Sequence, residues 1–178
     1  MAGGGRGFGQ NVVSTDIIHD RIHQGVFFQS TFYDGAVVNN AFLEVMLRVP
    51  TGSAAHFRWA VASGGNALGY MYHTPTLLTD GTARPALNFN GFSTNVALAS
   101  PFITPTFSDP GTAILDEIFF PGGQKNQASG GGGSSFEEFV LGPGDYLGRL
   151  QNIAGTTQPL QILITWYEPV EGRVAVLG

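Results

Sequence analysis

Two histidines near the amino terminus have the spacing most suggestive of chemistry in this chain. His19 and His23 stand four residues apart in the run HDRIH, which on a helix would place both imidazoles on one face. In zinc peptidases such a pair binds the metal while an intervening glutamate activates water. Here Asp20 replaces that glutamate and holds its carboxylate about one methylene short, and no third ligand is evident nearby. We therefore expect surface or interface histidines, with a metal-dependent hydrolase as the enzyme alternative.

Five carboxylates could in principle supply the acid and base of a glycosidase, because some hydrolases use sandwich folds. They are Asp116, Glu117, Glu137, Glu138 and Asp145. Adjacent pairs such as Glu137 and Glu138 point to opposite faces of a strand and cannot act on one substrate. No serine lies in a G-x-S-x-G turn, and the absence of cysteine excludes thiolate nucleophiles and thiolate metal sites. We predict a protein that is not an enzyme, with no catalytic residue, no cofactor and no metal.

The element that would carry the two histidines has two interpretations. Thr15 could cap a short helix that ends at Gly25, with Ile18 and Ile22 on one face. Equally, the segment from Asp16 could be extended and run directly into VFFQSTFY. The sequence leaves both open.

Period-2 alternation dominates the rest of the chain. Residues 112 to 168 hold four apolar runs joined by glycine-rich turns, which are TAILDEIFF, FEEFVL, DYLGRLQNI and PLQILITWYEP. In the last run Leu160, Ile162, Ile164 and Trp166 form one apolar face of a strand. The runs AFLEVMLRV and HFRWAVA repeat the pattern, with His56 and Arg58 of the second run facing outward. This is typical of antiparallel sheet.

Three further segments are also predicted to be strands. They are ALGYMYH, TARPALNFN and VALASPFITPTF, and Pro101 and Pro105 place the last on a sheet edge or in a bent crossover because proline lacks the amide donor. We predict an antiparallel β-sandwich with about nine or ten strands and little or no helix. A jelly roll is favoured, and an up-and-down barrel is the competing architecture. This single domain would span residues 16–169, between a flexible glycine-rich arm (1–15) and a tail (170–178).

The charge content is low for a domain of this size. Only 12% of the 178 residues are charged, against about 25% in ordinary soluble domains, and Lys125 is the only lysine. Such a surface suits permanent contact with other protein. With a net charge of −5 and no basic run, we expect no nucleic-acid partner. We find neither a secretory signal nor an apolar run of membrane-spanning length, so we expect no membrane partner and a cytosolic protein before assembly.

Two segments are candidates for contact with neighbouring subunits. The loop from Gly122 to Ser135 is too long for a tight hairpin and too rich in glycine to pack, so we expect it to order against a neighbour. Its candidate contact residues are Gly122, Gln124, Lys125, Asn126, Gln127, Ser129 and Ser134. The arm GGGRGFG lacks the strand and helix that a phosphate-binding loop requires. Its candidate contacts are Arg6 and Phe8.

Three long segments carry a family resemblance. IHQGVFFQSTF, AHFRWAVASGGNALGYMYHTPTLLTDGT and FFPGGQKNQASGGGGSSFEEFVLGPGDYLGRLQNIAGTTQPLQILITWYE resemble small virion structural proteins of tailed bacteriophages. The shared features are a His-x-Gly sequence before the first strand, a small-residue turn followed by aromatic-rich strands, a glycine-rich loop and an R-L-x-N-x-A-G turn between the last two strands. The match runs from Ile18 to Glu168, and the amino-terminal arm and the tail after Pro169 depart from the pattern.

The resemblance implies a component of the virus particle. We expect a capsid decoration (cement) protein that binds the major capsid protein on the capsid exterior, as a homo-oligomer with a trimer favoured. Before assembly it would reside in the host cytoplasm. The alternative is a tail or head-fibre module that binds host surface glycan, with Tyr70, Tyr72 and Trp166 as stacking platforms for sugar rings.

Overall fold

The computed structural model describes residues 17–122 and 138–169, which form thirteen strands and one short helix, α1 (Ile17–His23). The five-stranded sheet has the order β11 (Phe139–Leu141), β3 (Ala55–Ser63), β13 (Gln158–Tyr167), β1 (Phe27–Val37), β7 (Leu87–Asn88). The six-stranded sheet has the order β10 (Thr112–Phe120), β4 (Ala67–His73), β12 (Gly144–Asn152), β2 (Phe42–Val49), β8 (Ser100–Ile103), β6 (Thr82–Ala83). A separate ribbon pairs β5 (Thr76–Thr79) with β9 (Thr106–Asp109). All pairs are antiparallel.

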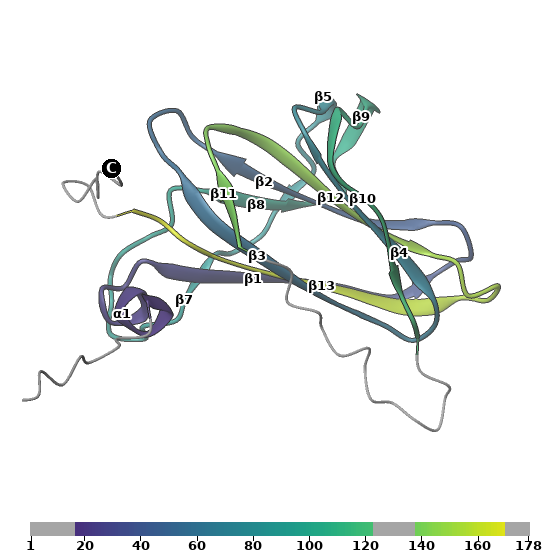
Figure 1. The fold of residues 1–178 in the computed structure, drawn as a ribbon, viewed down its shortest axis with the longest axis horizontal. Helices are drawn as coiled ribbons and strands as arrows, with labels where there is room; N and C mark the ends of the chain where they lie inside the picture. Colours follow the sequence, from purple (N-terminus) through teal and green to yellow (C-terminus); the bar gives the residue numbers. More distant parts are fainter. Residues whose placement is uncertain (1–16, 123–137, 170–178) are drawn as a thin grey trace, which may run out of the picture.

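The two large sheets pack face to face, and the predicted all-β antiparallel sandwich is confirmed (Figure 1). The predicted apolar face of β13 is buried, with Leu160, Ile162, Ile164 and Trp166 at most 1% exposed. Alternate residues of β2 and β3 fill the same core, because both strands read apolar-in and polar-out. The jelly-roll assignment stays a prediction.

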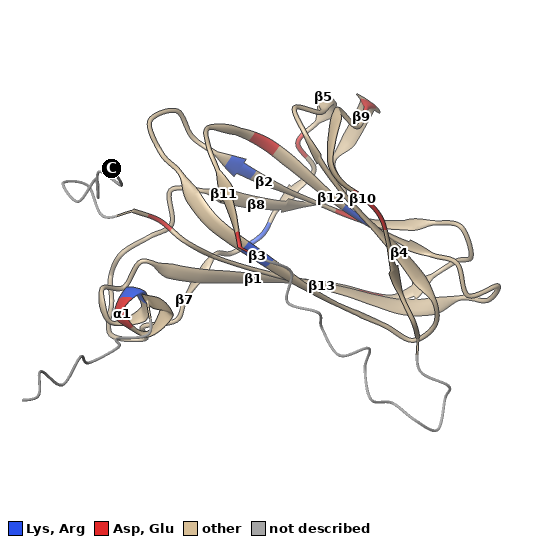
Figure 2. Cartoon of the chain, in the orientation of Figure 1, with Lys and Arg blue, Asp and Glu red and all other residues tan. Residues whose placement is uncertain are grey.

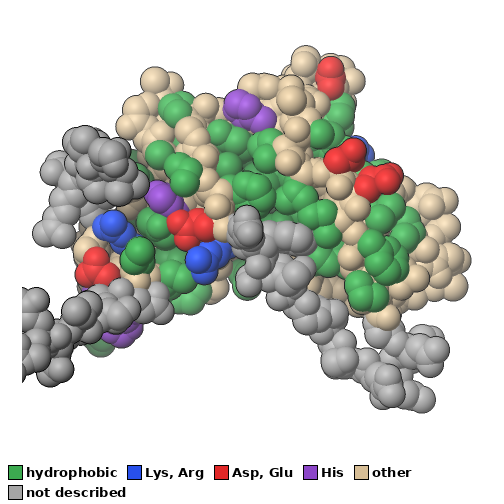
Figure 3. Space-filling model, viewed as in Figure 1, with side chains coloured by type: hydrophobic (Ala, Val, Ile, Leu, Met, Phe, Trp, Pro, Cys, Tyr) green, Lys and Arg blue, Asp and Glu red, His purple; other side chains and the backbone are tan. Residues whose placement is uncertain are grey.

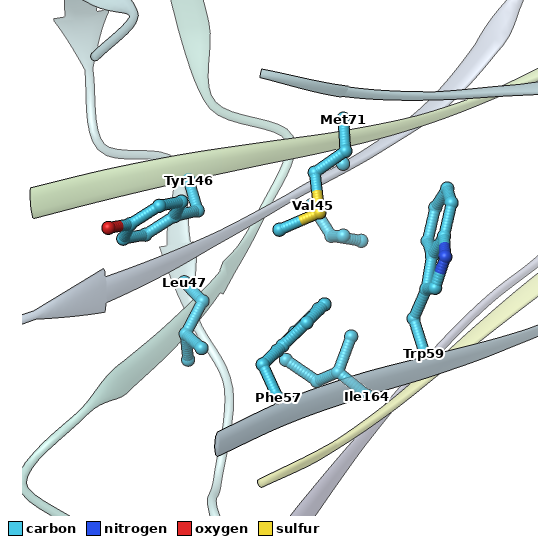
Figure 4. A pocket seen from close by; sticks show the side chains of 8 residues that line it. Val45, Leu47, Phe57, Trp59, Met71, Tyr146 and Ile164 are labelled. Atoms are coloured by element: carbon cyan, nitrogen blue, oxygen red, sulfur yellow. The ribbon is translucent and has the colours of Figure 1, made fainter. Parts of the chain in front are cut away.

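The centre of the sandwich is closed to ligands. Figure 4 shows Val45, Leu47, Phe57, Trp59, Met71, Tyr146 and Ile164 converging from both sheets on a gap between them. The space that they leave is about 10 Å³, roughly the room of a single water molecule. The gap between the two sheets therefore has no room for a ligand larger than water.

The strand count differs from the predicted nine or ten because two predicted segments are divided and because β5 (Thr76–Thr79) lies in no predicted segment. TARPALNFN forms β6 and β7, and VALASPFITPTF forms β8 and β9 with a sharp bend at Thr104, whose φ is 54°. Pro101 lies in β8, next to the edge of the sheet rather than at it. Its carbonyl accepts a hydrogen bond from Arg84 N on the β6 side. In an antiparallel strand the N–H and C=O of one residue point the same way, so the missing donor faces this short edge.

The segment before β1 is helical, which decides between the two interpretations of the sequence. The His-x-Gly sequence ends α1 in a Schellman motif, with Gly25 N donating to Ile22 O (2.9 Å) and Val26 N to Arg21 O (3.1 Å). Gly25 has a φ of 68°, and a Cβ there would lie 2.2 Å from Ser93 Oγ. Glycine is thus required both by the positive φ of the backbone and by the nearby side chain of Ser93.

The R-L-x-N-x-A-G sequence also has a structural explanation. Asn152 is fully buried, and its Nδ2 donates to Val37 O (2.8 Å) and Thr156 O (2.7 Å) while its Oδ1 accepts from Ala154 N (2.9 Å). One side chain thereby joins the end of β1 to the turn between β12 and β13. The turn itself is completed by Gly155, at a φ of 79°.

A bent ribbon stands on the outer side of the six-stranded sheet. Strands β4 and β10 continue into β5 and β9 through bends at Thr74 (φ 56°) and Gly111 (φ 92°), and the ribbon projects from the sandwich (Figure 1). Met46 and Leu147 belong to the outer face by their register, yet both are fully buried. Phe107 of β9 lies over the same face, 5.2 Å from the Arg149 guanidinium. The ribbon therefore encloses a small second apolar cluster.

The edges of the sheets are short or irregular. Strands β6 and β7 have two residues each and β11 has three. The long edge strand β10 has register shifts between Ala113 and Leu115 and between Leu115 and Ile118. Because these partners are short, β1 from Ser30 to Val37 and β3 from Arg58 to Ser63 pair with β13 alone among the described strands.

Candidate functional site

Residues 85–99, called the apolar loop here, carry the most exposed apolar side chains of the described structure. The loop has no charged residue, and its exposed large apolar side chains are Leu87, Phe89, Phe92, Val96 and Leu98. Phe92 is 102% exposed and Val96 is 82% exposed. Apolar groups gathered in this way on a surface are typical of a protein–protein contact.

Polar contacts hold the apolar loop against α1. Three asparagine side chains donate to the carbonyls that end the helix: Asn90 to His23 O (3.2 Å), Asn88 to Gly25 O (2.8 Å), and Asn95 to Gln24 O and Gly25 O (3.3 Å each). These carbonyls lack partners within the helix, so the loop supplies them. The amide groups of the asparagines therefore face α1, whereas Phe92, Val96 and Leu98 face solvent and Phe89 packs partly against Phe27 (4.8 Å).

A buried carboxylate fixes the other end of the apolar loop. Glu168 is 4% exposed and follows β13. It accepts hydrogen bonds from Leu98 N (2.9 Å), Ala99 N (2.8 Å) and the indole Nε1 of Trp166 (3.1 Å). The loop is therefore held in one conformation by the protein itself, with its apolar side chains left free to meet a partner.

Charged groups are sparse over the whole described fold (Figure 2). Apolar side chains also reach the surface on the face shown in Figure 3, where few charged groups separate them. Ile114, Phe119 and Val140 are exposed on β10 and β11. A second group of exposed apolar side chains therefore lies at the opposite edge of the sandwich from β7 and the apolar loop, and Asp116 and Glu117 of β10 lie among them.

Of the predicted contact residues, only Gly122 is described. Its backbone N donates to Asn66 Oδ1 (3.1 Å), and a Cβ at this position would overlap the backbone of Gly65. Gly122 thus anchors the start of the predicted contact loop against the turn between β3 and β4. The other candidates, Gln124, Lys125, Asn126, Gln127, Ser129 and Ser134, lie outside the described residues, as do the arm residues Arg6 and Phe8.

His19 and His23 lie together, as their spacing predicts. Their Nε2 atoms are 2.9 Å apart on the exposed side of α1. Within residues 17–122 and 138–169, no three His, Cys, Asp or Glu side chains are grouped so that they could hold a metal ion. The pair therefore has no third protein ligand in the described part of the chain.

The predicted carboxylates are dispersed rather than gathered. Asp145 binds Arg48 (2.7 Å), which also binds Asp80 (2.8 Å). Glu138 directly precedes β11 of the five-stranded sheet, and Asp116 and Glu117 lie in β10 at the edge of the other sheet. Glu137 is outside the described residues. Asp145 and Glu138 therefore belong to separate ion-pair clusters on different sheets.

Glu138 is the centre of a polar cluster beside α1. Its Oε1 accepts from Tyr167 OH (2.7 Å) and contacts His56 Nδ1 (2.6 Å), and its Oε2 lies 3.1 Å from Arg58. Burial opposes ionisation of Glu138, but the hydrogen bonds from Tyr167 and His56 hold its pKa below the usual value. Burial and the hydrogen bond to Glu138 raise the pKa of Tyr167 to about 12. These contacts attach β11 to β3 and β13.

The predicted sugar-stacking residues have different locations. Trp166 is fully buried in the core, so its prediction as a platform is wrong, because it belongs to the inward row of β13. Tyr70 and Tyr72 are half-buried on the outer face of β4, with rings 6.3 Å apart and nearly parallel. Phe42 and Arg149, which sequence reasoning did not single out, join them on that face. His73, at the end of β4, stacks on Tyr146 (4.7 Å).

The apolar loop was also missed as a site. Its signal in the sequence is an uncharged stretch, residues 85–108, in the first part of which Asn88, Asn90 and Asn95 favour turns over a continuous strand.

Comparison with protein-family models, with curated proteins and with solved structures finds no match for the chain. In the described part of the chain, no helix has the length and apolar character to cross a membrane.

Proposed function

We propose that the chain is a non-enzymatic virion structural protein, a decoration protein that binds the outer head lattice of a tailed bacteriophage and stabilises it. The observation that carries the proposal is the apolar loop, which presents Phe92, Val96 and Leu98 to solvent while Glu168 and three asparagines hold its backbone. A loop ordered before binding loses little conformational entropy when a partner covers it. The arrangement therefore favours a permanent contact.

The low charge supports the same role. With 12% charged residues, the surface can be covered without desolvating many ionic groups, each of which would oppose binding. A protein that binds only the assembled lattice stabilises it by mass action. Several copies joined in one oligomer add their contacts through effective concentration. We propose a homo-oligomer, with a trimer at a three-fold position favoured by symmetry.

The test uses the full-length protein and the phage whose genome encodes it. Sedimentation velocity gives the oligomeric state, and co-sedimentation measures binding to mature capsids and to free major capsid protein. We expect an oligomer that binds capsids but not free subunits. A monomer that does not bind capsids contradicts the proposal.

A pair of variants tests the role of the apolar loop. Phe92→Asp places a charge on a fully exposed side chain and should weaken capsid binding or oligomer formation without affecting folding. Leu78→Asp is the matched control, because Leu78 is 68% exposed on the β5–β9 ribbon, away from the loop. Equal behaviour of Phe92→Asp and the unaltered protein would remove the loop from the proposal.

A further inference from the structure

The outer face of the six-stranded sheet carries a row of aromatic and polar side chains, called the tyrosine face here. It consists of Tyr70 and Tyr72 of β4, Phe42 of β2, Gln151 of β12, and Asp116 and Glu117 of β10. Tyr70 and Phe42 have ring centroids 6.3 Å apart, and Tyr70 OH lies 3.5 Å from Gln151 Oε1. The aromatic rings come from strands on both sides of β12, so a rigid sheet fixes their spacing.

The two acidic residues reach this face through an irregularity of β10. Leu115 pairs with Met71 and Ile118 with Gly69, so Asp116 and Glu117 together stand opposite the single residue Tyr70. This is a β-bulge, in which one strand has an extra residue, and Glu117 has a φ of 46°. The side chains of Asp116 and Glu117 are exposed. Partial burial of Tyr70, together with the charges of Glu117 and Asp116, raises the pKa of Tyr70. Two carboxylates therefore border the tyrosine rings.

The charge of the tyrosine face is negative. The cation on this face, Arg149, is bound to Glu44 (2.9 Å) and lies 3.8 Å from the Phe42 ring. Within the described residues, no ion pair is formed by Asp116 or Glu117. The face thus offers aromatic rings, hydroxyl groups and free carboxylate oxygens, but no uncompensated positive charge.

We propose that the tyrosine face binds a neutral oligosaccharide. Aromatic rings pack against the apolar C–H faces of sugar rings, and the carboxylates and Gln151 are suited to accept hydrogen bonds from sugar hydroxyls. The uncompensated charges of Asp116 and Glu117 oppose anionic sugars such as uronic acids. The partner is therefore a neutral glycan rather than an acidic one.

The tyrosine face and the apolar loop lie on different sides of the sandwich, so a partner that covers the loop leaves the tyrosine face exposed. Trp59 of β3 lies against Phe120 of β10 (6.5 Å), so β10 is above the β3 side of the five-stranded sheet. The apolar loop contains β7, the edge strand on the opposite side. Sugar binding consequently does not depend on the proposed capsid contact, and each proposal can fail without the other.

The experiment is a binding screen of the full-length protein against immobilised neutral and acidic bacterial surface oligosaccharides, followed by calorimetric titration with cellohexaose, maltohexaose, chitohexaose and a galacturonate hexamer. We expect at least one neutral oligosaccharide to bind. Tyr70→Ala and Tyr72→Ala should each weaken that binding roughly tenfold or more, the loss typical of a central aromatic contact. The acidic hexamer should bind more weakly than its neutral counterparts.

Matched variants distinguish the tyrosine face from a second surface that exposes a tyrosine. Tyr33 is 62% exposed beside a shallow depression of about 180 Å³ on the outer face of the other sheet, and Tyr33→Ala should leave binding unchanged. The Asp116→Asn, Glu117→Gln double variant should bind the acidic hexamer better than the unaltered protein does. Absence of binding to any neutral oligosaccharide, indifference to Tyr70→Ala and Tyr72→Ala, or loss with Tyr33→Ala would overturn the proposal. Phe92→Asp should retain sugar binding whether or not it binds capsids.

Discussion

Replacement of Glu168 tests how the apolar loop is held. The carboxylate accepts three hydrogen bonds, from Leu98 N, Ala99 N and Trp166 Nε1, and it is 4% exposed. In Glu168→Ala these donors lose their acceptor while the surrounding strands stay in place. Glu168→Gln keeps one oxygen acceptor but turns an amide N–H₂ toward a backbone N–H.

The size of the effect follows from which donors can reach water. Ala99 and Trp166 are 2% and 0% exposed, so their N–H groups stay dry, whereas exposed Leu98 can be hydrated. Each buried unsatisfied donor costs about 1–3 kcal/mol, so two give roughly 2–6 kcal/mol. Removal of a buried charge offsets part of this. We expect Glu168→Ala to lower the free energy of unfolding by on the order of 3 kcal/mol, and Glu168→Gln by about 1 kcal/mol.

Urea unfolding monitored by tryptophan fluorescence gives the free energy of unfolding, and amide hydrogen exchange reports on Leu98 and Ala99. Both amides should lose protection in Glu168→Ala. Glu117→Gln is the matched control, because Glu117 is exposed in β10 and should change stability by less than about 0.5 kcal/mol. A Glu168→Ala protein as stable as this control, with both amides still protected, would refute the reasoning.

Three other predictions follow from the turn at Gly25 and the Glu138 cluster. Gly25→Ala should lower the thermal midpoint more than Gly52→Ala does, because both have positive φ but only Gly25 meets Ser93 Oγ, at 2.2 Å; equal midpoints would contradict the contact. The folded pKa of Glu138 lies below its ordinary 4.5, so its stabilisation is complete above that pH and lost as pH falls through the folded pKa. In urea titrations, the stability difference between the unaltered protein and Glu138→Gln should therefore narrow from about pH 5 toward pH 3; a constant difference would exclude a depressed pKa. The pKa of Tyr167 is raised from 10.0 to about 12. The free energy of unfolding of the unaltered protein should therefore fall as the pH rises from about 10 to about 12, and Tyr167→Phe should not show this fall.

The strands whose apolar face lies in the core were predictable from the sequence. Leu160, Ile162 and Ile164 alternate with more polar residues, and burial of one sheet face requires that alternation. Trp166 continues the same row, so the pattern already placed it inside. Its prediction as a sugar platform followed its residue type and not its position.

The apolar loop could not be found from periodicity. Leu87 and Phe89 alternate as the core strands do, but the structure leaves both exposed. A period-2 pattern indicates an apolar face without indicating whether the same chain or another covers it. The tyrosine face was found only in part, because Phe42 and Arg149 reach Tyr70 through strand pairing between distant segments. The bulge that brings Asp116 and Glu117 there is a property of register, which the order of residues in one strand does not reveal.

The edges of the sheets matter when many copies of the protein are close together. A neutral β-protein crowded on a surface risks joining its neighbours through open strands and growing into fibrils. Here β6, β7 and β11 offer two or three residues each, and β10 is interrupted by bulges that carry Asp116 and Glu117. The bulges of β10 therefore oppose backbone pairing at that edge, whereas β1 and β3, which extend beyond their short partners, are the strands at which such joining would start.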